Sequence, residues 1–169
     1  RRVDRVGVDR LQLQIGIRDR DETRSLFELE LDNVRVPLNR VLARGPSAAK
    51  LCRRLMIQRD FALACDCVGA AAELLDKTVA YLQTRQQFGV VIGQFQALKH
   101  QLADMALAVE PSRGLYWYAA HALDHVEEDA ERTAAIAKAH ITDAFMQVAR
   151  DATEAHGGIG FTWEGDTQM

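Results

Sequence analysis

The chain has 169 residues, of which 48% are hydrophobic and 27% charged, and its formal net charge is −3. This composition is ordinary for a globular protein, and it gives no electrostatic support for binding nucleic acid. No apolar run approaches the roughly 20 residues of a membrane-spanning helix, and no signal peptide is evident, so we expect a cytoplasmic protein without a membrane partner.

Residues 1–45 have the alternating, β-branched pattern of strands. We expect one strand over Leu11–Ile17, a charged turn over Arg18–Glu22, a second strand over Leu26–Leu31, and an extended piece over Val34–Val36 that Pro37 ends. Two or three short strands do not form a stable sheet alone. Because the chain also begins with Arg1 and not Met, we expect a fragment of a larger protein whose sheet it ends.

A long helix is predicted to follow the Gly45-Pro46-Ser47 break and to continue to Thr84. Apolar residues recur at steps of three and four along it, which is the spacing of a single buried stripe. The members of this stripe are Phe61, Ala64, Val68, Ala71, Leu75, Val79 and Leu82.

Two further helices are predicted, one from about Phe95 to Val126 and one from about Glu128 to Ala155. Pro111 should kink or break the first of them, because proline lacks the backbone donor and clashes with the preceding turn. The Gly157-Gly158 pair should end the second. A fourth helix could begin after Trp163. The fold class is therefore mainly α, an up-down helical bundle over 46–169 that is incomplete and is preceded by a few strands.

Several common kinds of site are absent from the sequence. The three cysteines do not indicate a disulfide scaffold, and Cys65 and Cys67 point to opposite sides of a helix, so we expect helix packing and no metal site. No histidine follows a Glu at the spacing of a di-iron bundle. Gly157-Gly158-Ile159-Gly160 follows a helix and not a strand, which excludes a Rossmann phosphate loop.

Polar residues and glycines at the predicted helix ends remain as candidates. Arg85 and Gln96 bracket a tight connection, where a cation and an amide would suit a diphosphate. The alternative is that Arg85 merely caps its own helix, and local physics alone favours it. At His156-Gly157-Gly158 the glycines would let a ligand approach the backbone, although the local sequence alone favours a plain helix stop.

Three stretches in this order resemble the acyl-CoA dehydrogenase family. They are the segment Tyr81–Gln96 (YLQTRQQFGVVIGQFQ) with its continuation through Met105, the segment His156–Glu164 (HGGIGFTWE), and Leu31–Pro37 (LDNVRVP). The last resembles the end of the family's central β-domain, which makes 1–45 its remnant and 46–169 the C-terminal bundle.

The resemblance implies FAD-dependent α,β-dehydrogenation of an acyl-CoA thioester to an enoyl-CoA, as in fatty acid metabolism. It further implies an electron-transfer acceptor protein as a partner and a homo-oligomer, either a dimer or a tetramer. The residues that match the family's FAD contacts are Arg85, Gln87, Phe88, Phe95, Gln96, Glu154, Gly157 and Gly158. The stretch from Glu154 to Gly158 would contact the FAD diphosphate of a neighbouring subunit.

Two departures from the family pattern bear on this prediction. Glu154 stands where the family often has Gln, and a carboxylate beside a diphosphate is unfavourable. The family's catalytic Glu either lies beyond Met169 or matches Arg59, which cannot act as a base. Asp60 is adjacent but lies about 100° around the helix. The catalytic residue is therefore not identified, and the alternative function is a catalytically impaired or non-catalytic helical subunit that supports an active dehydrogenase.

Overall fold

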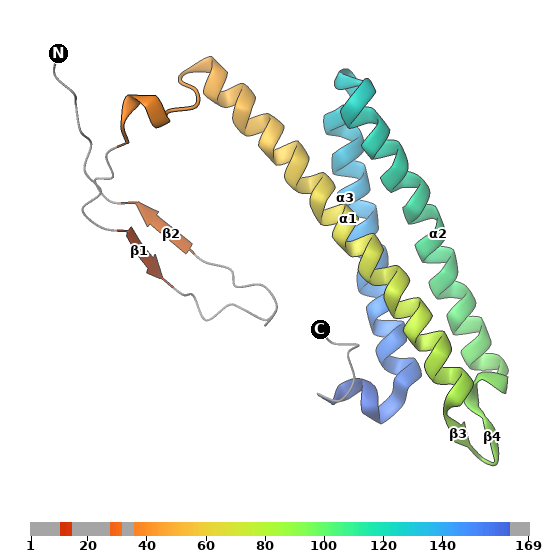
Figure 1. Ribbon diagram of the computed structural model, residues 1–169. Coiled ribbons are helices and arrows are strands. Elements are labelled where there is room, and N and C mark those ends of the chain that lie inside the picture. The colour runs from red at the N-terminus through yellow and green to blue at the C-terminus, as the bar shows by residue number, and fades with distance from the viewer. Residues whose placement is uncertain (1–10, 15–27, 32–35, 163–169) are drawn as a thin grey trace. The chain divides into compact units, whose positions relative to one another are not determined.

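The computed structural model describes residues 11–14, 28–31 and 36–162. Two compact units divide between Arg53 and Arg54, and each is described by itself. The first holds a small β-hairpin and the second holds the helices that carry the candidate site. Figure 1 shows the elements of both units in chain order.

The β-hairpin consists of β1 (Leu11–Gln14) and β2 (Glu28–Leu31), which pair antiparallel with Leu11 opposite Leu31. Both strands fall within the predicted ranges. The remaining residues of those ranges, the Arg18–Glu22 turn and most of the Val34–Val36 piece lie outside the described residues. A 3₁₀ turn, η1 (Leu38–Arg40), follows Pro37.

Three long helices make up the second unit, except that the start of the first helix, before Arg54, belongs to the first unit. They are α1 (Pro46–Thr84), α2 (Gln96–His125) and α3 (Glu127–His156). Between α1 and α2 lie β3 (Gln86–Gln87), β4 (Val90–Val91) and η2 (Ile92–Gln94), and η3 (Gly157–Phe161) follows α3. The predicted mainly helical fold is confirmed, and the three helix boundaries agree with the predicted ones to within a residue or two.

Local chemistry explains these boundaries. Gly45 has a φ of +57° and its carbonyl accepts the amides of Ala48 and Ala49, so α1 begins at Pro46, a residue suited to the first helical position. The acidic residues Glu127, Glu128 and Asp129 fill the first turn of α3, where the helix dipole favours negative charge. Gly157 ends α3 with a φ of +62°, as the Gly-Gly pair predicted.

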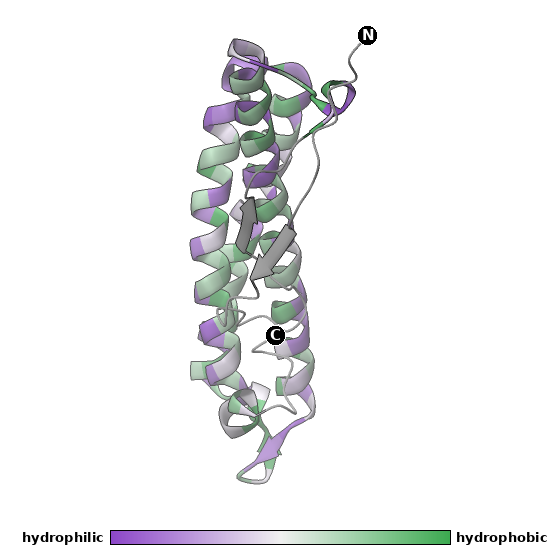
Figure 2. Ribbon diagram, turned by 90° about the vertical axis from the view of Figure 1, so that its left-hand side faces the viewer, coloured by the Kyte–Doolittle hydropathy of each residue, from purple (hydrophilic) through white to green (hydrophobic). Residues whose placement is uncertain are grey.

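The helices pack as an antiparallel up-down bundle. Ala64 and Val68 of α1 meet Ala119 of α2 and Ile141 of α3 in one cluster. Farther along α1, a second cluster contains residues from earlier in α2 and later in α3: Ala71, Leu74, Met105, Val109, Val148 and Ala152. This opposite progression along α2 shows that it runs antiparallel to both neighbours. Figure 2 shows hydrophilic and hydrophobic segments alternating along each helix.

Alanine dominates the interior of this bundle. Of the 17 buried hydrophobic residues among those described, 9 are alanines. Small side chains let helix backbones approach closely, as α2 and α3 do here. Leu82, Met105 and Ile141 are the largest side chains that are fully buried.

The buried face of α1 differs in part from the predicted stripe. Ala64, Val68, Ala71 and Leu82 are buried as predicted, whereas Leu75 and Val79 are half-buried. Leu74 and Thr78 occupy the interior in their place. Thr78 was not predicted there because it is polar, but its hydroxyl donates to the Leu74 carbonyl at 2.6 Å, which removes the cost of burying it.

The predicted break at Pro111 does not occur, because α2 runs through it. Proline removes one helical hydrogen bond, which leaves the carbonyl of Leu107 without its usual donor. Leu107 and Pro111 both lie on the exposed side of α2, where water can reach that carbonyl. The neighbouring Ser112 is buried and donates its hydroxyl hydrogen to the Ala108 carbonyl at 2.8 Å.

Within the described residues, none of the helices combines the length and the apolar character that a bilayer crossing requires.

Candidate functional site

A tight hairpin connects α1 to α2. Gln87 pairs with Val90, so Phe88 and Gly89 form a two-residue turn with φ values of +54° and +79°. Positive φ at both positions is the mark of a type I′ turn, which matches the twist of the flanking strands. Glycine adopts this conformation freely, whereas the aromatic Phe88 is held in it at an energetic cost.

The base of the hairpin is anchored to α1. The Ile92 amide donates to the Arg85 carbonyl at 2.8 Å, and the buried Ile92 side chain contacts Leu82. A β-carbon added to Gly93 would lie 2.8 Å from the Leu82 carbonyl oxygen. Glycine is therefore required at position 93 for the chain to pass this close to α1.

The five candidate side chains of this segment all face outward. Arg85, Gln87, Phe88, Phe95 and Gln96 are exposed, and Phe88 is 91% exposed. The rings of Phe88 and Phe95 meet edge to face with centroids 6.2 Å apart. The Gln96 amide lies 3.0 Å from the His100 imidazole. Among the described residues the Arg85 guanidinium forms no ion pair, so its charge is available to a ligand.

The second candidate segment lies at the end of α3. Glu154, Gly157 and Gly158 are exposed there. A β-carbon added to Gly157 or Gly158 would meet nothing within 4 Å, so the space over this backbone is open. Gly160 is different, because a β-carbon there would collide with the carbonyl oxygen of Thr153. Gly160 thus folds η3 back against α3, while the two preceding glycines leave backbone uncovered.

Tyr81 and His156 bring the two segments together at one end of the bundle. Their rings stack with centroids 4.4 Å apart and planes inclined by 21°. Beneath them Leu82, Ile92 and Ala155 form a buried cluster, so the hairpin, α1 and α3 share one small core. The β3–β4 hairpin and the end of α3 lie at the same end of the helices in Figure 1.

The sequence assigned no role to the side chain of Tyr81 or to that of His156. The Tyr–x₃–Arg spacing placed Tyr81 one turn before Arg85, but nothing in the sequence pairs it with a residue 75 positions later. Gln101 was likewise missed, although its side chain donates to the Asp151 carbonyl at 3.1 Å and ties α2 to α3.

This arrangement suits an anionic ligand that also carries a flat ring system. Arg85 supplies a cation, Gln96 an amide, and Gly157-Gly158 an open stretch of backbone. Phe88 and Phe95 add exposed aromatic surface. Glu154 opposes an anion, because its carboxylate is exposed on the last turn of α3, where the helix dipole is also negative.

Arg59 and Asp60, the residues weighed as a site for a catalytic base, form an ion pair on α1. The Arg59 Nη2 atom lies 2.7 Å from Asp60 Oδ1, and Nε donates to the same oxygen at 3.0 Å. The Asp60 side chain is 22% exposed. Its carboxylate is therefore engaged by the neighbouring guanidinium and is not presented as an unpaired base.

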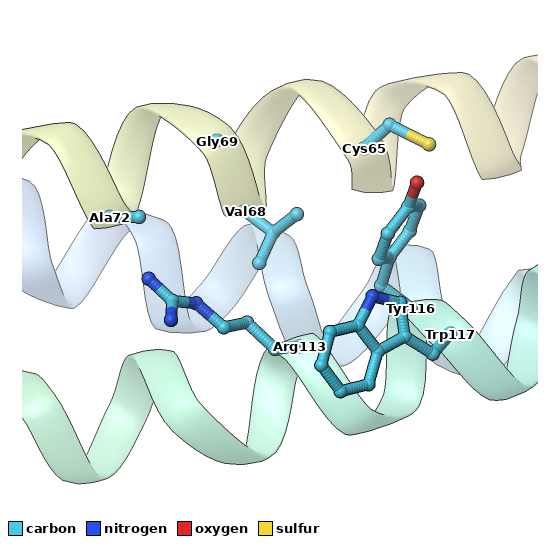
Figure 3. A pocket seen from close by; sticks show the side chains of 7 residues that line it. All are labelled: Cys65, Val68, Gly69, Ala72, Arg113, Tyr116 and Trp117. Atoms are coloured by element: carbon cyan, nitrogen blue, oxygen red, sulfur yellow. The ribbon is translucent and has the colours of Figure 1, made fainter.

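A shallow hollow of about 350 Å³ lies elsewhere, between α1 and α2. Figure 3 shows its lining, with Cys65, Val68, Gly69 and Ala72 on one helix and Arg113, Tyr116 and Trp117 on the other. Burial raises the pKa of the Cys65 thiol, and a hydrogen bond with Tyr116 partly offsets this. A raised pKa keeps the thiol protonated and unreactive. Among the described residues, no group of three or more metal-ligating side chains is placed to hold a metal ion.

Comparison with known proteins identifies the relatives of this chain. The family model "Acyl-CoA dehydrogenase, C-terminal domain" matches residues 50–169. The chain is 40% identical over 107 residues to the acyl-CoA dehydrogenase IpdE2 of Mycolicibacterium smegmatis, which covers 63% of this chain and 32% of that protein.

Solved structures share the fold. A glutaryl-coenzyme A dehydrogenase in complex with glutaryl-CoA matches with a TM-score of 0.76 and 31% identity, over 85% of this chain and 35% of that one. PigA with FAD and proline matches with a TM-score of 0.73 and 29% identity, over 80% of this chain and 35% of that one. The chain therefore spans about a third of the length of the proteins that it matches.

Proposed function

Since the chain belongs to the acyl-CoA dehydrogenase family through its C-terminal domain, we propose that it is the C-terminal part of an FAD-dependent enzyme that converts an acyl-CoA thioester to an enoyl-CoA. The observation that carries this proposal is the meeting of the hairpin and the Gly157-Gly158 segment at one end of the bundle. Two segments far apart in sequence, each matching a flavin-contact motif, are thereby available to a single ligand.

The residues present fit the charge and shape of FAD. Its diphosphate is anionic, which suits the Arg85 guanidinium, and the open backbone at Gly157 and Gly158 leaves space for it. Exposed rings at Phe88 and Phe95 offer surface to a flat heterocycle. Among the structural relatives, PigA binds FAD and the glutaryl-CoA dehydrogenase binds an acyl-CoA, which supports both ligand classes.

When bound, FAD supplies the hydride acceptor that protein side chains lack. The residues of this chain bind and orient it. The Arg85 guanidinium pairs with the negative charge of FAD, and the amides of Gln87 and Gln96 offer it hydrogen bonds. The rings of Phe88 and Phe95 cover apolar surface of the cofactor. We assign no catalytic base within this chain, because Arg59 cannot accept a proton and Asp60 is engaged by Arg59.

The test is an anaerobic titration of the full-length protein. Purified protein should absorb near the wavelengths of oxidised flavin, and this absorbance should bleach when an acyl-CoA of the right chain length is added. A series of straight, branched and cyclic acyl-CoA thioesters covers the substrate range. A full-length protein that contains no flavin and takes up none from added FAD would refute the proposal.

One observation favours a second candidate, a non-catalytic subunit that supports an active dehydrogenase. Arg59 occupies the position that matches the base of some family members, and its guanidinium neutralises the adjacent Asp60. A subunit with this pair could keep the flavin-binding corner and lack proton abstraction. In this case the pure protein would bind FAD but would not be reduced by any thioester.

The two candidates are separated by one substitution and one pull-down. In a non-catalytic subunit that lacks a carboxylate beyond Met169, Arg59→Glu should restore reduction by acyl-CoA, while Arg59→Gln should not. The wild-type protein should also co-purify with an active homologue. In an active enzyme the wild-type protein is reduced by acyl-CoA without any partner, and substitutions at Arg59 change the rate of this reduction little.

Electron transfer and assembly complete the proposal. An electron-transfer acceptor protein would reoxidise the flavin, and a dimer or tetramer would bring Glu154–Gly158 of one subunit, together with the Arg85 segment beside it, to the flavin of another. A molar mass equal to that of one subunit in light scattering of the full-length protein would contradict the assembly. The cytoplasmic location remains a prediction from the sequence.

A further inference from the structure

Tyr81 and His156 form a contact between the hairpin side and the glycine side of the candidate site, above the buried cluster that also joins them. Tyr81 lies on α1 one turn before Arg85, and His156 immediately precedes Gly157. Their rings stack at 4.4 Å between centroids. Both residues are half-buried, so the stack covers the small core of Leu82, Ile92 and Ala155 at its outer edge.

The His156 ring is fixed from a second direction. Its Nδ1 atom lies 2.7 Å from the Ala152 carbonyl oxygen. Because a carbonyl oxygen only accepts, Nδ1 carries the hydrogen and donates it, which sets the rotation of the imidazole. The ring is thus held by its own helix on the one side and by Tyr81 on the other.

The Tyr81 hydroxyl adds a weaker tie. It donates toward the His156 carbonyl over 3.4 Å, which is longer than the usual range for a hydroxyl donor. The carbonyl belongs to the residue that leads into Gly157, where the backbone turns to a φ of +62°. Ring stacking therefore contributes more to the link than the hydroxyl does.

We propose that Tyr81 and His156 are a pair of positioning residues that fixes the Gly157-Gly158 backbone relative to Arg85. This inference rests on the proposed function, in which both segments contact FAD. Neither ring needs to touch the flavin. The pair holds two flavin-contacting segments at a fixed separation, so that the diphosphate meets a site that is already formed.

A second aromatic pair in the chain provides a matched control for Tyr81 and His156. Phe61 and Tyr116 stack with centroids 5.5 Å apart and planes inclined by 12°, in the middle of the bundle. Removing one ring from either pair should lower thermal stability. A positioning role predicts that loss at Tyr81 also weakens FAD binding, whereas loss at Tyr116 does not.

The binding experiment uses the full-length protein stripped of flavin and titrated with FAD, followed by flavin fluorescence. Tyr81→Leu and His156→Leu should each weaken binding about 3- to 10-fold, the size expected for one aromatic pair. Tyr81→Phe, which keeps the ring and loses the hydroxyl, should bind within about twofold of wild type. Tyr116→Leu should bind as wild type at a temperature where it is folded.

A second measurement needs no flavin. It follows hydrogen exchange at two backbone amides beside the glycines. The Gly157 amide donates to the Glu154 carbonyl, and the Thr162 amide donates to the Ile159 carbonyl. Tyr81→Leu and His156→Leu should accelerate exchange at both amides, and Tyr116→Leu should leave them unchanged. Either variant suffices if the other does not fold.

The outcomes separate the two proposals. If wild type binds FAD and both leucine variants bind it equally well, the positioning role is refuted and the proposed function stands. If wild type binds no FAD, the proposed function fails, and hydrogen exchange still decides whether Tyr81 orders the glycine segment. Unchanged exchange at Gly157 and Thr162 in both variants would overturn the inference by itself.

Discussion

At the scale of single residues, Gly93 shows how one missing side chain sets the position of the hairpin. A β-carbon at Gly93 would lie 2.8 Å from the Leu82 carbonyl oxygen, which belongs to rigid helix backbone. Gly93→Ala should therefore lower the free energy of unfolding by about 1–3 kcal/mol, the usual cost of overpacking.

Gly69 provides the control for this prediction. It lies within α1 with nothing within 4 Å of an added β-carbon. Gly69→Ala should stabilise the protein by about 0.5–1 kcal/mol, because alanine loses less backbone entropy in a helix. Urea unfolding of both variants measures the two effects, and equal stability of Gly93→Ala and wild type would mean that the hairpin is not pressed against α1.

Glu154 is the candidate residue whose charge opposes its assigned ligand. It is exposed at the negative end of α3, where an anionic diphosphate gains nothing from it. Glu154→Gln should strengthen FAD binding by the full-length protein up to about fivefold at low salt, the worth of one solvent-screened charge at close range. The gain should shrink at higher ionic strength.

Glu128→Gln is the matched control, since Glu128 is exposed at the opposite end of the same helix. Equilibrium titration with FAD at two salt concentrations distinguishes the sites. Weaker binding by Glu154→Gln would show that the carboxylate accepts a hydrogen bond from the ligand, and would reverse its assigned effect.

At the scale of secondary-structure elements, the helices were predictable because their ends carry local signals. Gly45-Pro46 and Gly157 mark their boundaries by backbone conformation alone, so neighbouring residues suffice to find them. The burial of Leu74 and Thr78 was not predicted, because the buried stripe drifts around a helix of 3.6 residues per turn. Of the kink or break expected at Pro111, the break does not occur, because the carbonyl that Pro111 releases lies on the exposed side of α2.

In the β3–β4 hairpin, Phe88 is both the strained residue of the turn and a candidate FAD contact. Phe88 adopts a φ of +54°, where Asn is far better tolerated, and its ring is 91% exposed. Phe88→Asn should raise the free energy of unfolding by about 1 kcal/mol. The same change should weaken FAD binding, because the aromatic surface is lost. Opposite signs in the two measurements would identify strain that is retained for binding.

Phe88→Tyr keeps both the ring and the strained backbone, and so serves as the control. Its stability and its affinity for FAD should both remain near those of wild type. Chemical denaturation and flavin titration of the two variants give the comparison. If Phe88→Asn bound FAD as tightly as wild type, Phe88 would be a turn residue only.

At the scale of the whole molecule, the sequence did not predict that the Arg85 segment and the Gly157 segment of one chain lie next to each other. The motifs around Arg85 and Gly157 could each be found from their own residues. Their meeting depends on the number of helical turns in α2 and α3 between them and on the packing of Ile92 and Ala155. Such a distance is fixed by tertiary packing, and no local pattern encodes it.

Under the proposed function, residues 1–169 alone should bind FAD poorly. Its five hairpin candidates are exposed, so a ligand there would be covered on one side only. We expect a dissociation constant about 100-fold or more weaker than that of the full-length protein, which corresponds to the loss of roughly 3 kcal/mol of binding free energy. Isothermal titration of both proteins measures the difference, and equal affinities would show that residues 1–169 hold the complete flavin site.

The alanine-rich interior of the bundle has a consequence for how such a protein can change over time. Where alanines separate two helix backbones, any larger residue pushes the helices apart. A glycine at such a position destabilises the helix that carries it. Mutational drift is therefore blocked in both directions at positions such as Ala119, Ala137 and Ala152, which are fully buried. A library of random variants under selection for folding should accumulate changes on the outer faces of the helices and almost none along this seam.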